Sequence, residues 1–299
     1  NNLIISVGSV ALDSLIINNK HYNKILGGSA TYFSIIASLY SKVYISAIVG
    51  NDFPNQHLKL LKSKNINFDY FSIERGRTFR WGGEYSQNLH RRTTHFTELG
   101  VFETFNPQFV SGKEFKGILF LGNIQPQLQL SALRQLPNAN IVITDTMNLW
   151  IDLNKELLYK VIKKSNIFML NDEEAEQLTN TSEIKKSAKI LLSKGPSCVI
   201  IKQGAKGCLL STKKYNIHIP IFDEIISKDP TGAGDSFAGG FTGYLSKYDV
   251  NNLIEAAIHG AAAASFTVSE IGINGIKNID IDLIQQRCNV IQNKMEILV

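Results

Sequence analysis

The sequence predicts an α/β protein, a three-layer α/β/α sandwich with a mostly parallel central sheet. Short apolar runs rich in β-branched residues alternate with segments of helical spacing, which is typical of consecutive β–α–β units. The predicted strands are apolar at almost every position, as expected for strands buried on both faces. The chain has 299 residues, 44% hydrophobic and 19% charged, which is enough to bury a large core without disulfides.

Six segments have the composition of central strands, and five have helical spacing. The strands are expected at 3–10, 43–49, 117–121, 141–144, 167–170 and 198–202, and the helices at 30–39, 58–62, 128–136, 153–162 and 184–192. In the first helical segment, Phe33, Ile36 and Ala37 fall on one face. No internal repeat or low-complexity linker interrupts the series, so we expect residues 1–299 to form one domain.

Two segments, 11–26 and 68–105, break this alternation. The first is short and polar, and the second holds β-prone stretches around Arg80-Trp81 and at 93–97. We therefore expect a small β-sheet outside the main one. It could be only a surface hairpin, or it could be a lid over a site at the carboxyl ends of the strands, where α/β sheets bind ligands. The aromatic and Arg content of 68–105 keeps the lid interpretation open beside the simpler one.

Charge and cysteine content argue against several classes of function. Lys and Arg number 31 and Asp and Glu number 26, so the formal net charge is +5. The basic residues are dispersed, which disfavours a nucleic-acid partner and is equally compatible with small anionic substrates. The three cysteines have no CxxC spacing, which argues against structural zinc and fits a reducing compartment. No apolar run reaches the length of a membrane span, so we expect no membrane association and a cytoplasmic protein.

The most informative stretch is Asp229-Pro230-Thr231-Gly232-Ala233-Gly234-Asp235-Ser236-Phe237-Ala238-Gly239-Gly240. Three small residues precede an acid that opens a predicted helix. Their backbone N–H groups can point to one place, where the helix N-terminus adds partial positive charge. Such an anion hole suits a phosphoryl group in transfer, and Asp235 beside it could accept a proton from an attacking hydroxyl. A helix cap with glycines for a tight turn would explain a bare GxGD, but the whole run is more specific.

This stretch resembles the C-terminal signature of the ribokinase-like (PfkB) sugar and nucleoside kinases, with Pro230 in place of the usual Thr. Four further matches follow in the family's order: Gly8 to Asp13 after the first strand, Gly27-Gly28-Ser29-Ala30, Asn171-Asp172-Glu173-Glu174, and Lys202-Gln203-Gly204-Ala205-Lys206-Gly207. Together they span nearly the whole chain. The resemblance implies a ribokinase-like fold with a small β lid and an ATP-dependent phosphotransferase that uses an alcohol group as acceptor.

The resemblance also implies a role for each matching position. Asp235 would be the general base, and Gly232, Ala233 and Gly234 would form the anion hole. ATP would be bound by Asn171, Lys202, Gly204 and Gly207, with His259 at the edge of the adenine pocket. Mg²⁺ would be held by Glu174 through water, and Asp229 would belong to a monovalent-cation site for an ion such as K⁺. Substrate hydroxyls would be bound by Asp13, Gly27 and Gly28.

Several of these residues also have a simpler structural interpretation. Glu174 could be an acidic residue at a helix N-terminus, and the glycines near 204 could form a plain turn. His259 precedes a run of alanines, where a histidine is often simply packed. Other kinase and nucleotide-binding classes are excluded more firmly. The chain lacks GxxxxGK[ST], the HRD and DFG motifs of protein kinases, and a GxGxxG after the first strand.

The phosphoryl acceptor is left open by the sequence. Tyr32 stands where ribokinases have an Asn that contacts a sugar hydroxyl, which puts ribose itself in doubt. Arg80 and Trp81 could stack on a ring or meet an anionic acceptor, or the exposed β segment could join two copies in a homodimer. We expect a sugar kinase first and a nucleoside kinase second, with Trp81, Phe33 and Tyr32 as candidates for a base slot. A catalytically idle relative is disfavoured because Asp235 and its glycines are intact.

Overall fold

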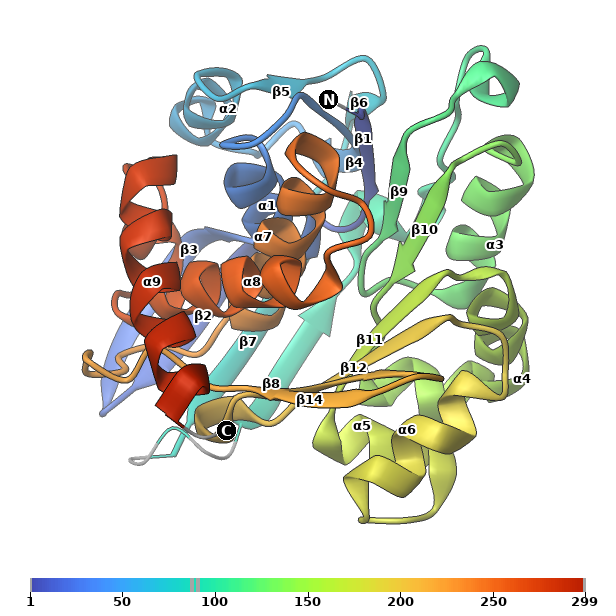
Figure 1. The fold of residues 1–299 in the computed structure, drawn as a ribbon. Helices are drawn as coiled ribbons and strands as arrows, with labels where there is room; N and C mark the ends of the chain where they lie inside the picture. Colours follow the sequence, from blue (N-terminus) through green and yellow to red (C-terminus); the bar gives the residue numbers. More distant parts are fainter. Residues whose placement is uncertain (1, 87–88, 90–91, 298–299) are drawn as a thin grey trace.

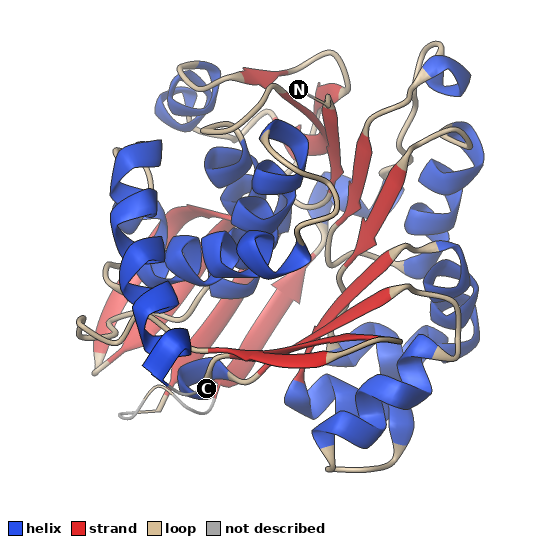
Figure 2. Cartoon of the chain, viewed as in Figure 1, coloured by secondary structure: helices blue, strands red, loops and turns tan. Residues whose placement is uncertain are grey.

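The computed structural model describes residues 2–86, 89 and 92–297. They form a ten-stranded sheet, helices on both of its faces, and a second sheet of four strands (Figure 1). Figure 2 shows the main sheet as a twisted central layer between two groups of helices. The prediction of an α/β sandwich with a mostly parallel sheet is confirmed.

The main sheet has the strand order β14-β13-β12-β11-β10-β9-β1-β4-β5, with β6 paired to β4. Its strands are β1 (Ile4–Val7), β4 (Val43–Gly50), β5 (Ile66–Asn67), β6 (Phe71–Glu74), β9 (Ile118–Leu121), β10 (Ile141–Thr144), β11 (Ile167–Asn171), β12 (Cys198–Lys202), β13 (Cys208–Thr212) and β14 (Asn216–Ile219). All pairs are parallel except those of the β12–β13–β14 meander. All six predicted strands lie in this sheet.

Helices cover both faces of the sheet. They are α1 (Ser29–Ala37), α2 (Asn55–Lys62), α3 (Pro126–Gln135), α4 (Asn148–Lys164), α5 (Asp172–Thr179), α6 (Ile184–Leu192), α7 (Ala233–Lys247), α8 (Leu253–Val268) and α9 (Ile281–Ile297). Short 3-10 helices are η1 (Gly100–Thr104), η2 (Gly112–Glu114), η3 (Gly204–Lys206) and η4 (Gly272–Gly275). In Figure 1, α1, α7, α8 and α9 lie on one face of the sheet and α3 to α6 on the other.

Strand β9 explains why the central strands read as unbroken apolar runs. Its residues alternate between the two faces of the sheet. Ile118 and Phe120 belong to the core under α1, α7 and α8, where the rings of Phe33 and Phe120 stack with centroids 3.8 Å apart. Leu119 and Leu121 belong to the core under α3 and α4. Both faces of this strand are therefore covered by apolar side chains, and neither requires a polar residue.

The second sheet has the order β3-β2-β7-β8, from β2 (Ala11–Ile17), β3 (Lys20–Gly27), β7 (Arg80–Tyr85) and β8 (Arg92–Glu98). The β excursions predicted at 11–26 and 68–105 supply its strands, but the second is shorter than expected. Residues 71–74 form β6, which pairs with β4 of the main sheet, and residues 100–104 form η1. Strand β8 lies at an edge of the sheet, and a homodimer through this sheet stays a prediction.

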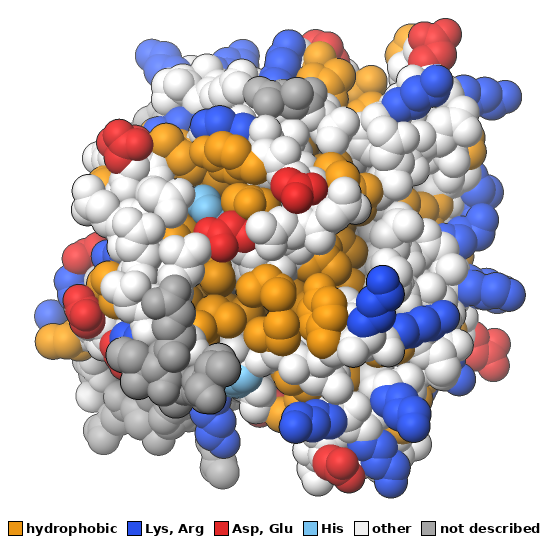
Figure 3. Space-filling view, in the orientation of Figure 1, with side chains coloured by type: hydrophobic (Ala, Val, Ile, Leu, Met, Phe, Trp, Pro, Cys, Tyr) orange, Lys and Arg blue, Asp and Glu red, His pale blue; other side chains and the backbone are white. Residues whose placement is uncertain are grey.

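The surface seen in Figure 3 is mixed in character. Apolar side chains occupy the middle of this face, and Lys and Arg side chains lie mostly towards its edges. An apolar groove of about 310 Å³ runs between α8 and α9 and is lined in part by Phe222, Phe266 and Leu283. Within the described residues, no helix is both long and apolar enough to cross a membrane.

Candidate active site

The glycine-rich run of the sequence forms the N-terminus of α7, as predicted. Gly232 is the N-cap in the left-handed region at φ +76°, and Asp235 lies in the first turn of the helix. The Ala233 N–H donates to the Pro230 carbonyl at 3.2 Å and closes the turn, so its assignment to the anion hole is corrected: this donor is already paired. For the Gly232 and Gly234 N–H groups, the described part of the chain supplies no acceptor. These two donors, at the positive end of a helix dipole, are suited to bind an anion.

The ends of three neighbouring parallel strands bring charged side chains to this helix. Asn171 ends β11 and is the register partner of Lys202 at the end of β12. Asp145 follows β10, and its Oδ2 accepts a hydrogen bond from Lys202 Nζ at 2.9 Å. A Cβ on Gly234 would lie 3.0 Å from Lys202 Nζ, so the ammonium group lies directly against the start of α7.

The environment of Lys202 keeps it charged. Burial lowers the pKa of its ammonium group, but the carboxylates of Asp145, Glu174 and Asp235 act in the opposite direction, and the net pKa is raised. A cation therefore lies among three acids at the strand ends. Sequence reasoning missed Asp145. The signal was an acid directly after a predicted parallel strand, a position where ligand-binding residues gather.

Asn171 and Glu174 make the reciprocal contacts of a capping box. The Glu174 N–H donates to Asn171 Oδ1 at 2.8 Å, and the Asn171 N–H donates to Glu174 Oε2 at 2.8 Å. Glu174 is therefore an acidic residue at a helix N-terminus, as the simpler interpretation predicted. Its carboxylate is also close enough to Lys202 to raise the pKa of that lysine, so it faces the site.

The predicted nucleotide-side turn is present between β12 and β13. Gly204 and Gly207 both have positive φ, at +55° and +86°; Gly204 begins the single turn of η3 and Gly207 directly follows it. A Cβ on Gly207 would come within 2.2 Å of the Ile219 carbonyl oxygen, whereas one on Gly204 would meet nothing within 4 Å. Gly204 therefore presents open backbone at the sheet edge that carries Lys202. Contact of this turn with ATP stays a prediction.

The predicted substrate residues lie on the other side of Gly232. Asp13 is almost fully buried on β2, and its carboxylate lies against Gly27, where a Cβ would come within 1.9 Å of Oδ2. Gly28 caps α1, which carries Tyr32. The Tyr32 ring packs against Gly232, since a Cβ there would fall 2.4 Å from the ring. This ring therefore lies against the turn that begins α7.

The Tyr32 hydroxyl is buried and has no hydrogen-bond partner in the described residues. Burial raises the pKa of Tyr32 well above its ordinary value, and the charges of Asp13, Asp229 and Asp235 raise it further. The hydroxyl therefore keeps its proton. A buried donor without an acceptor is costly, so this atom is a candidate contact for a ligand.

Trp81 and Tyr85 lie on the face of the second sheet that is turned towards α7. They alternate with Gly83 on β7, whose register partners on β2 are Asp13, Leu15 and Ile17. A Cβ on Gly83 would come within 2.1 Å of the Trp81 ring, so the indole packs against Gly83. Because Trp81 is the register partner of Asp13, an aromatic residue lies next to that carboxylate.

A hydrogen bond joins this sheet to the loop that leads into α7. The Thr231 hydroxyl donates to the Tyr85 hydroxyl oxygen at 2.9 Å, and Thr231 directly precedes Gly232. Apolar contacts among Leu15, Ile17 and Ile271 also hold the second sheet in place. Sequence reasoning missed Tyr85, because no local pattern reveals a contact across 146 residues.

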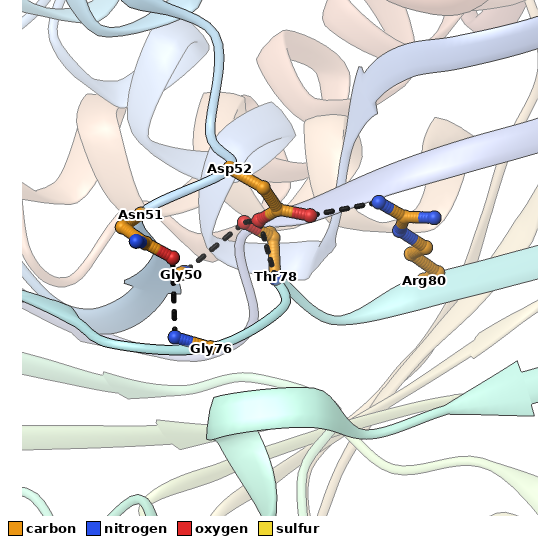
Figure 4. Close-up of polar contacts among 6 residues, drawn as sticks. All are labelled: Gly50, Asn51, Asp52, Gly76, Thr78 and Arg80. Carbon is orange, nitrogen blue, oxygen red and sulfur yellow. Dashed lines mark hydrogen bonds and ion pairs between the residues drawn. The ribbon is translucent and has the colours of Figure 1, made fainter.

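Arg80 does not share this face, contrary to its assignment as a substrate residue. It precedes Trp81 on β7, and successive residues of a strand point to opposite faces. Its Nη2 donates to Asp52 Oδ2 at 2.7 Å, and Asp52 Oδ1 accepts from the Thr78 N–H and hydroxyl (Figure 4). Partial burial raises the pKa of Asp52, but these hydrogen bonds outweigh it, and the net pKa is lowered. Arg80 thus anchors the second sheet to the loop after β4.

His259 does not line the site either, and its assignment to the adenine pocket is corrected. The ring is buried between α1, α7 and α8, with Nδ1 hydrogen-bonded to the Tyr40 hydroxyl at 2.8 Å and Tyr244 packed against it. Tyr40 follows the C-terminal end of α1, whereas the site lies at the N-terminal end of that helix. Packing, the simpler interpretation of a histidine beside alanines, is the correct one.

Asp229 is fully buried and ties two loops together. Its Oδ1 accepts from the Thr231 N–H at 2.9 Å and its Oδ2 from the Gly272 N–H at 2.8 Å. Burial raises the pKa of this carboxyl, and the hydrogen bonds from Thr231 and Gly272 partly offset the effect. Both oxygens already have partners, so a monovalent cation here would depend mainly on backbone carbonyls, and the cation site stays a prediction.

The strand ends, the glycine-flanked helix and its acid together define a phosphotransferase of the ribokinase-like class. The chain belongs to the PfkB family of carbohydrate kinases, whose family model matches residues 2–278. It is an enzyme that transfers a phosphoryl group to an alcohol acceptor. The resemblance inferred from the sequence motifs is confirmed.

Two archaeal relatives are similar over most of their length. A cytidine kinase from Thermococcus kodakarensis is 28% identical over 254 residues, covering 82% of this chain and 88% of its own. A nucleoside kinase from Methanocaldococcus jannaschii is 27% identical over 260 residues, covering 83% and 81%. The crystal structure of a nucleoside kinase from that organism superposes with a TM-score of 0.78 over 97% of this chain and 99% of its own, at 25% identity.

The fold is also shared with a putative ribokinase II from E. coli, solved in complex with ATP and Mg²⁺. The TM-score is 0.81 over 97% of this chain and 100% of that one, at 16% identity. This likeness supports the architecture of the sheet and its helices.

Proposed function

We propose that the protein transfers the γ-phosphoryl group of ATP to a hydroxyl on the sugar of a nucleoside. The observation that carries this proposal is the N-terminus of α7. There, Asp235 lies in the first turn, and the N–H groups of Gly232 and Gly234 are left for an anion. Tyr32, a candidate acceptor contact, packs against Gly232, and Lys202 from the end of β12 packs against Gly234.

The chemistry follows from this arrangement. The acceptor oxygen forms a bond to the γ-phosphorus while the bond to the β–γ bridging oxygen breaks, and ADP leaves. The hydroxyl proton passes to the Asp235 carboxylate. The free N–H groups stabilise the charge on the oxygens of the phosphoryl group in transit. Such a transfer depends mainly on positioning and charge stabilisation, which this site can supply.

The acidic residues fit a magnesium ion that is held mostly by water and phosphate. Within the described residues, no three His, Cys, Asp or Glu side chains gather into a metal-binding set. Mg²⁺ commonly keeps several waters and uses one or two carboxylates together with substrate phosphates. Glu174 could provide such a carboxylate through water, and the ion would supply charge neutralisation to the ATP phosphates.

A nucleoside is preferred here over the simple sugar that the sequence favoured. The indole of Trp81 packs against Gly83, and Trp81 is the register partner of Asp13, whose carboxylate is buried. A flat aromatic plane suits a base, and a carboxylate suits the hydroxyls of the attached sugar. A cytidine kinase and a nucleoside kinase match over most of the chain at 28% and 27% identity, whereas a fructokinase that matches over a similar length does so at 22%, which supports the same order.

An acceptor panel tests this proposal. ADP release from ATP and Mg²⁺ is measured with cytidine, uridine, adenosine, inosine, ribose and fructose. We expect turnover with at least one nucleoside and a rise of about tenfold or more in its KM for Trp81→Ala, since stacking of a base on an aromatic ring contributes about 1–3 kcal/mol.

Phe96→Ala is the matched control. This ring lies over Gly82, the neighbouring glycine, on the opposite face of the same sheet. Its removal should leave the KM unchanged. Turnover with ribose or fructose but with no nucleoside would restore the sugar kinase, and an equal effect of both aromatic substitutions would argue against a base on Trp81.

A further inference from the structure

The charged end of Lys202 lies against the helix that would hold the phosphoryl group. The side chain extends from the end of β12 to the first turn of α7 and is only 17% exposed. Its Nζ lies where a Cβ on Gly234 would be almost in contact, at 3.0 Å. A group bound by the Gly234 N–H would therefore be within reach of this ammonium.

Asp145 fixes the position of that ammonium. Besides the 2.9 Å contact of its Oδ2 with Lys202 Nζ, its Oδ1 accepts from the Thr146 N–H at 2.9 Å. Its backbone is held as well, because the N–H donates to Leu121 and the carbonyl accepts from the Gln129 side chain. The position of the Asp145 carboxylate is therefore fixed. It accepts one N–H of the Lys202 ammonium group, and the other N–H bonds can point towards a ligand.

The charge on Lys202 matches the needs of phosphoryl transfer better than those of a base-binding role. An ammonium is a compact, strongly hydrated point charge, and it binds phosphate oxygens well and adenine rings poorly. Negative charge spread over the γ-phosphoryl oxygens is what such a reaction must neutralise. The carboxylates of Glu174 and Asp235 act on the charge of this lysine, so its positive charge in turn offsets the repulsion between these two negative charges.

We propose that Lys202 is a catalytic residue that contacts the γ-phosphoryl group during transfer, and that Asp145 positions it. The inference rests on the proposed function of the site. Lys202 keeps its proton throughout and forms no bond to phosphorus. The acceptor oxygen replaces the ADP oxygen on the γ-phosphorus, and Asp235 takes the acceptor proton. Lys202 stabilises the negative charge on the phosphoryl oxygens as this group passes from ADP to the acceptor.

The test compares binding of ATP and ADP, each with Mg²⁺, by calorimetry. If Lys202 meets the γ-phosphoryl group, Lys202→Met should weaken ATP binding about 10–100-fold, the usual effect of a charge-assisted hydrogen bond, and leave ADP binding within about twofold. Its kcat should fall about 100-fold or more. Lys202→Arg keeps the charge and should recover part of the ATP preference. Asp145→Asn should lose part of it and lower kcat more than it raises the KM for the acceptor.

Lys213→Met is the matched control, because Lys213 is an exposed lysine in the turn between β13 and β14, at the opposite end of the β12–β13 pair from Lys202. It should bind both nucleotides as the unchanged protein does. Equal weakening of ATP and ADP by Lys202→Met would overturn the inference, and so would an unchanged kcat. If Lys202→Met does not fold, the ratio of ATP affinity to ADP affinity is measured for Lys202→Gln and Lys202→Arg instead. Failure of the proposed function is distinct, since the unchanged protein would then phosphorylate no nucleoside while its ATP and ADP affinities stay measurable.

Discussion

Gly232 begins helix α7 and packs against the Tyr32 ring, and both features depend on its lacking a side chain. Its φ is +76°, and any Cβ would fall 2.4 Å from the Tyr32 ring. The glycine therefore allows the ring to approach the loop while its N–H stays available to an anion. A strained, tightly packed turn at this point holds the two halves of the site in fixed relation.

Gly232→Ala should accordingly harm both stability and turnover. We expect a loss of about 1–3 kcal/mol in the free energy of unfolding and a fall in kcat of at least about tenfold, because the ring or the loop must move. Chemical denaturation and steady-state kinetics measure the two effects. Gly204→Ala is the control for backbone strain alone, since its φ is +55° and its Cβ would meet nothing. Equal losses of stability in the two variants would show that the Tyr32 contact is unimportant.

At the scale of single residues, the sequence could predict the positions that a motif carries and little beyond them. Asp235 and Lys202 stand in motifs with fixed spacing, and both lie at the site. Asp145 stands alone after a strand, so only the fold reveals that it meets Lys202 across 57 residues. Arg80 was misassigned because composition alone does not give the phase of a strand, and one residue of shift exchanges its faces.

A hydrogen bond links the second sheet to the residue that precedes the start of helix α7. Tyr85 on β7 accepts a hydrogen bond from Thr231, the residue before Gly232. Strand β7 is also held at its other end by Asp52, which binds Thr78 and Arg80 (Figure 4). The strand that carries Trp81 is therefore fixed at both ends relative to the anion hole, which is what a cover over the acceptor would need.

Tyr85→Phe tests this connection. Loss of one buried hydrogen bond should cost about 1 kcal/mol in the free energy of unfolding, with the Thr231 hydroxyl left without its partner. We also expect the KM for the acceptor to rise more than that for ATP, because the second sheet covers the acceptor side. Thermal or chemical unfolding and two KM titrations provide these values. An increase confined to the KM for ATP would contradict the assignment of this sheet to the acceptor.

The core of the whole molecule also contains a titratable group away from the site. His259 joins α1, α7 and α8 through Tyr40 and Tyr244, and burial, assisted by Lys247, lowers its pKa to about 4. Because an unfolded histidine has a pKa of about 6.5, the unfolded chain binds a proton that the folded chain does not between these two values. Stability should therefore fall as the pH drops from about 6.5 towards 4.

His259→Gln should reduce that pH dependence. Between pH 7 and pH 5 the unchanged protein should lose roughly 2 kcal/mol more unfolding free energy than the variant does, a figure set by the fall in pKa at about 1.4 kcal/mol per unit. Denaturant unfolding at the two pH values measures the difference. His95→Gln, on the exposed strand β8, is the control. An equal pH dependence in the unchanged protein and His259→Gln would mean that the buried imidazole is not held neutral by the fold.

The architecture of the whole molecule was the part most open to prediction. Alternation of apolar runs with helical spacing identifies the parallel sheet, because strands buried on both faces must be apolar at every position, as β9 is. The second sheet could be predicted because its segments interrupt the alternation of strands and helices. Its strand order and the face that it turns towards α7 could not be predicted. Those depend on contacts such as Tyr85 with Thr231 and Leu15 with Ile271, which no local pattern encodes.

The central claim is that Asp235 takes the acceptor proton at an anion hole formed by the start of α7. The most direct measurement is the single-turnover rate of Asp235→Asn with ATP, Mg²⁺ and the best nucleoside of the panel, together with its ATP affinity. The account predicts a fall of about 10²–10⁴ in the rate, the usual contribution of a positioned base, with ATP binding nearly unchanged. A near-normal rate in the variant would contradict the account, because the proton would then have another acceptor.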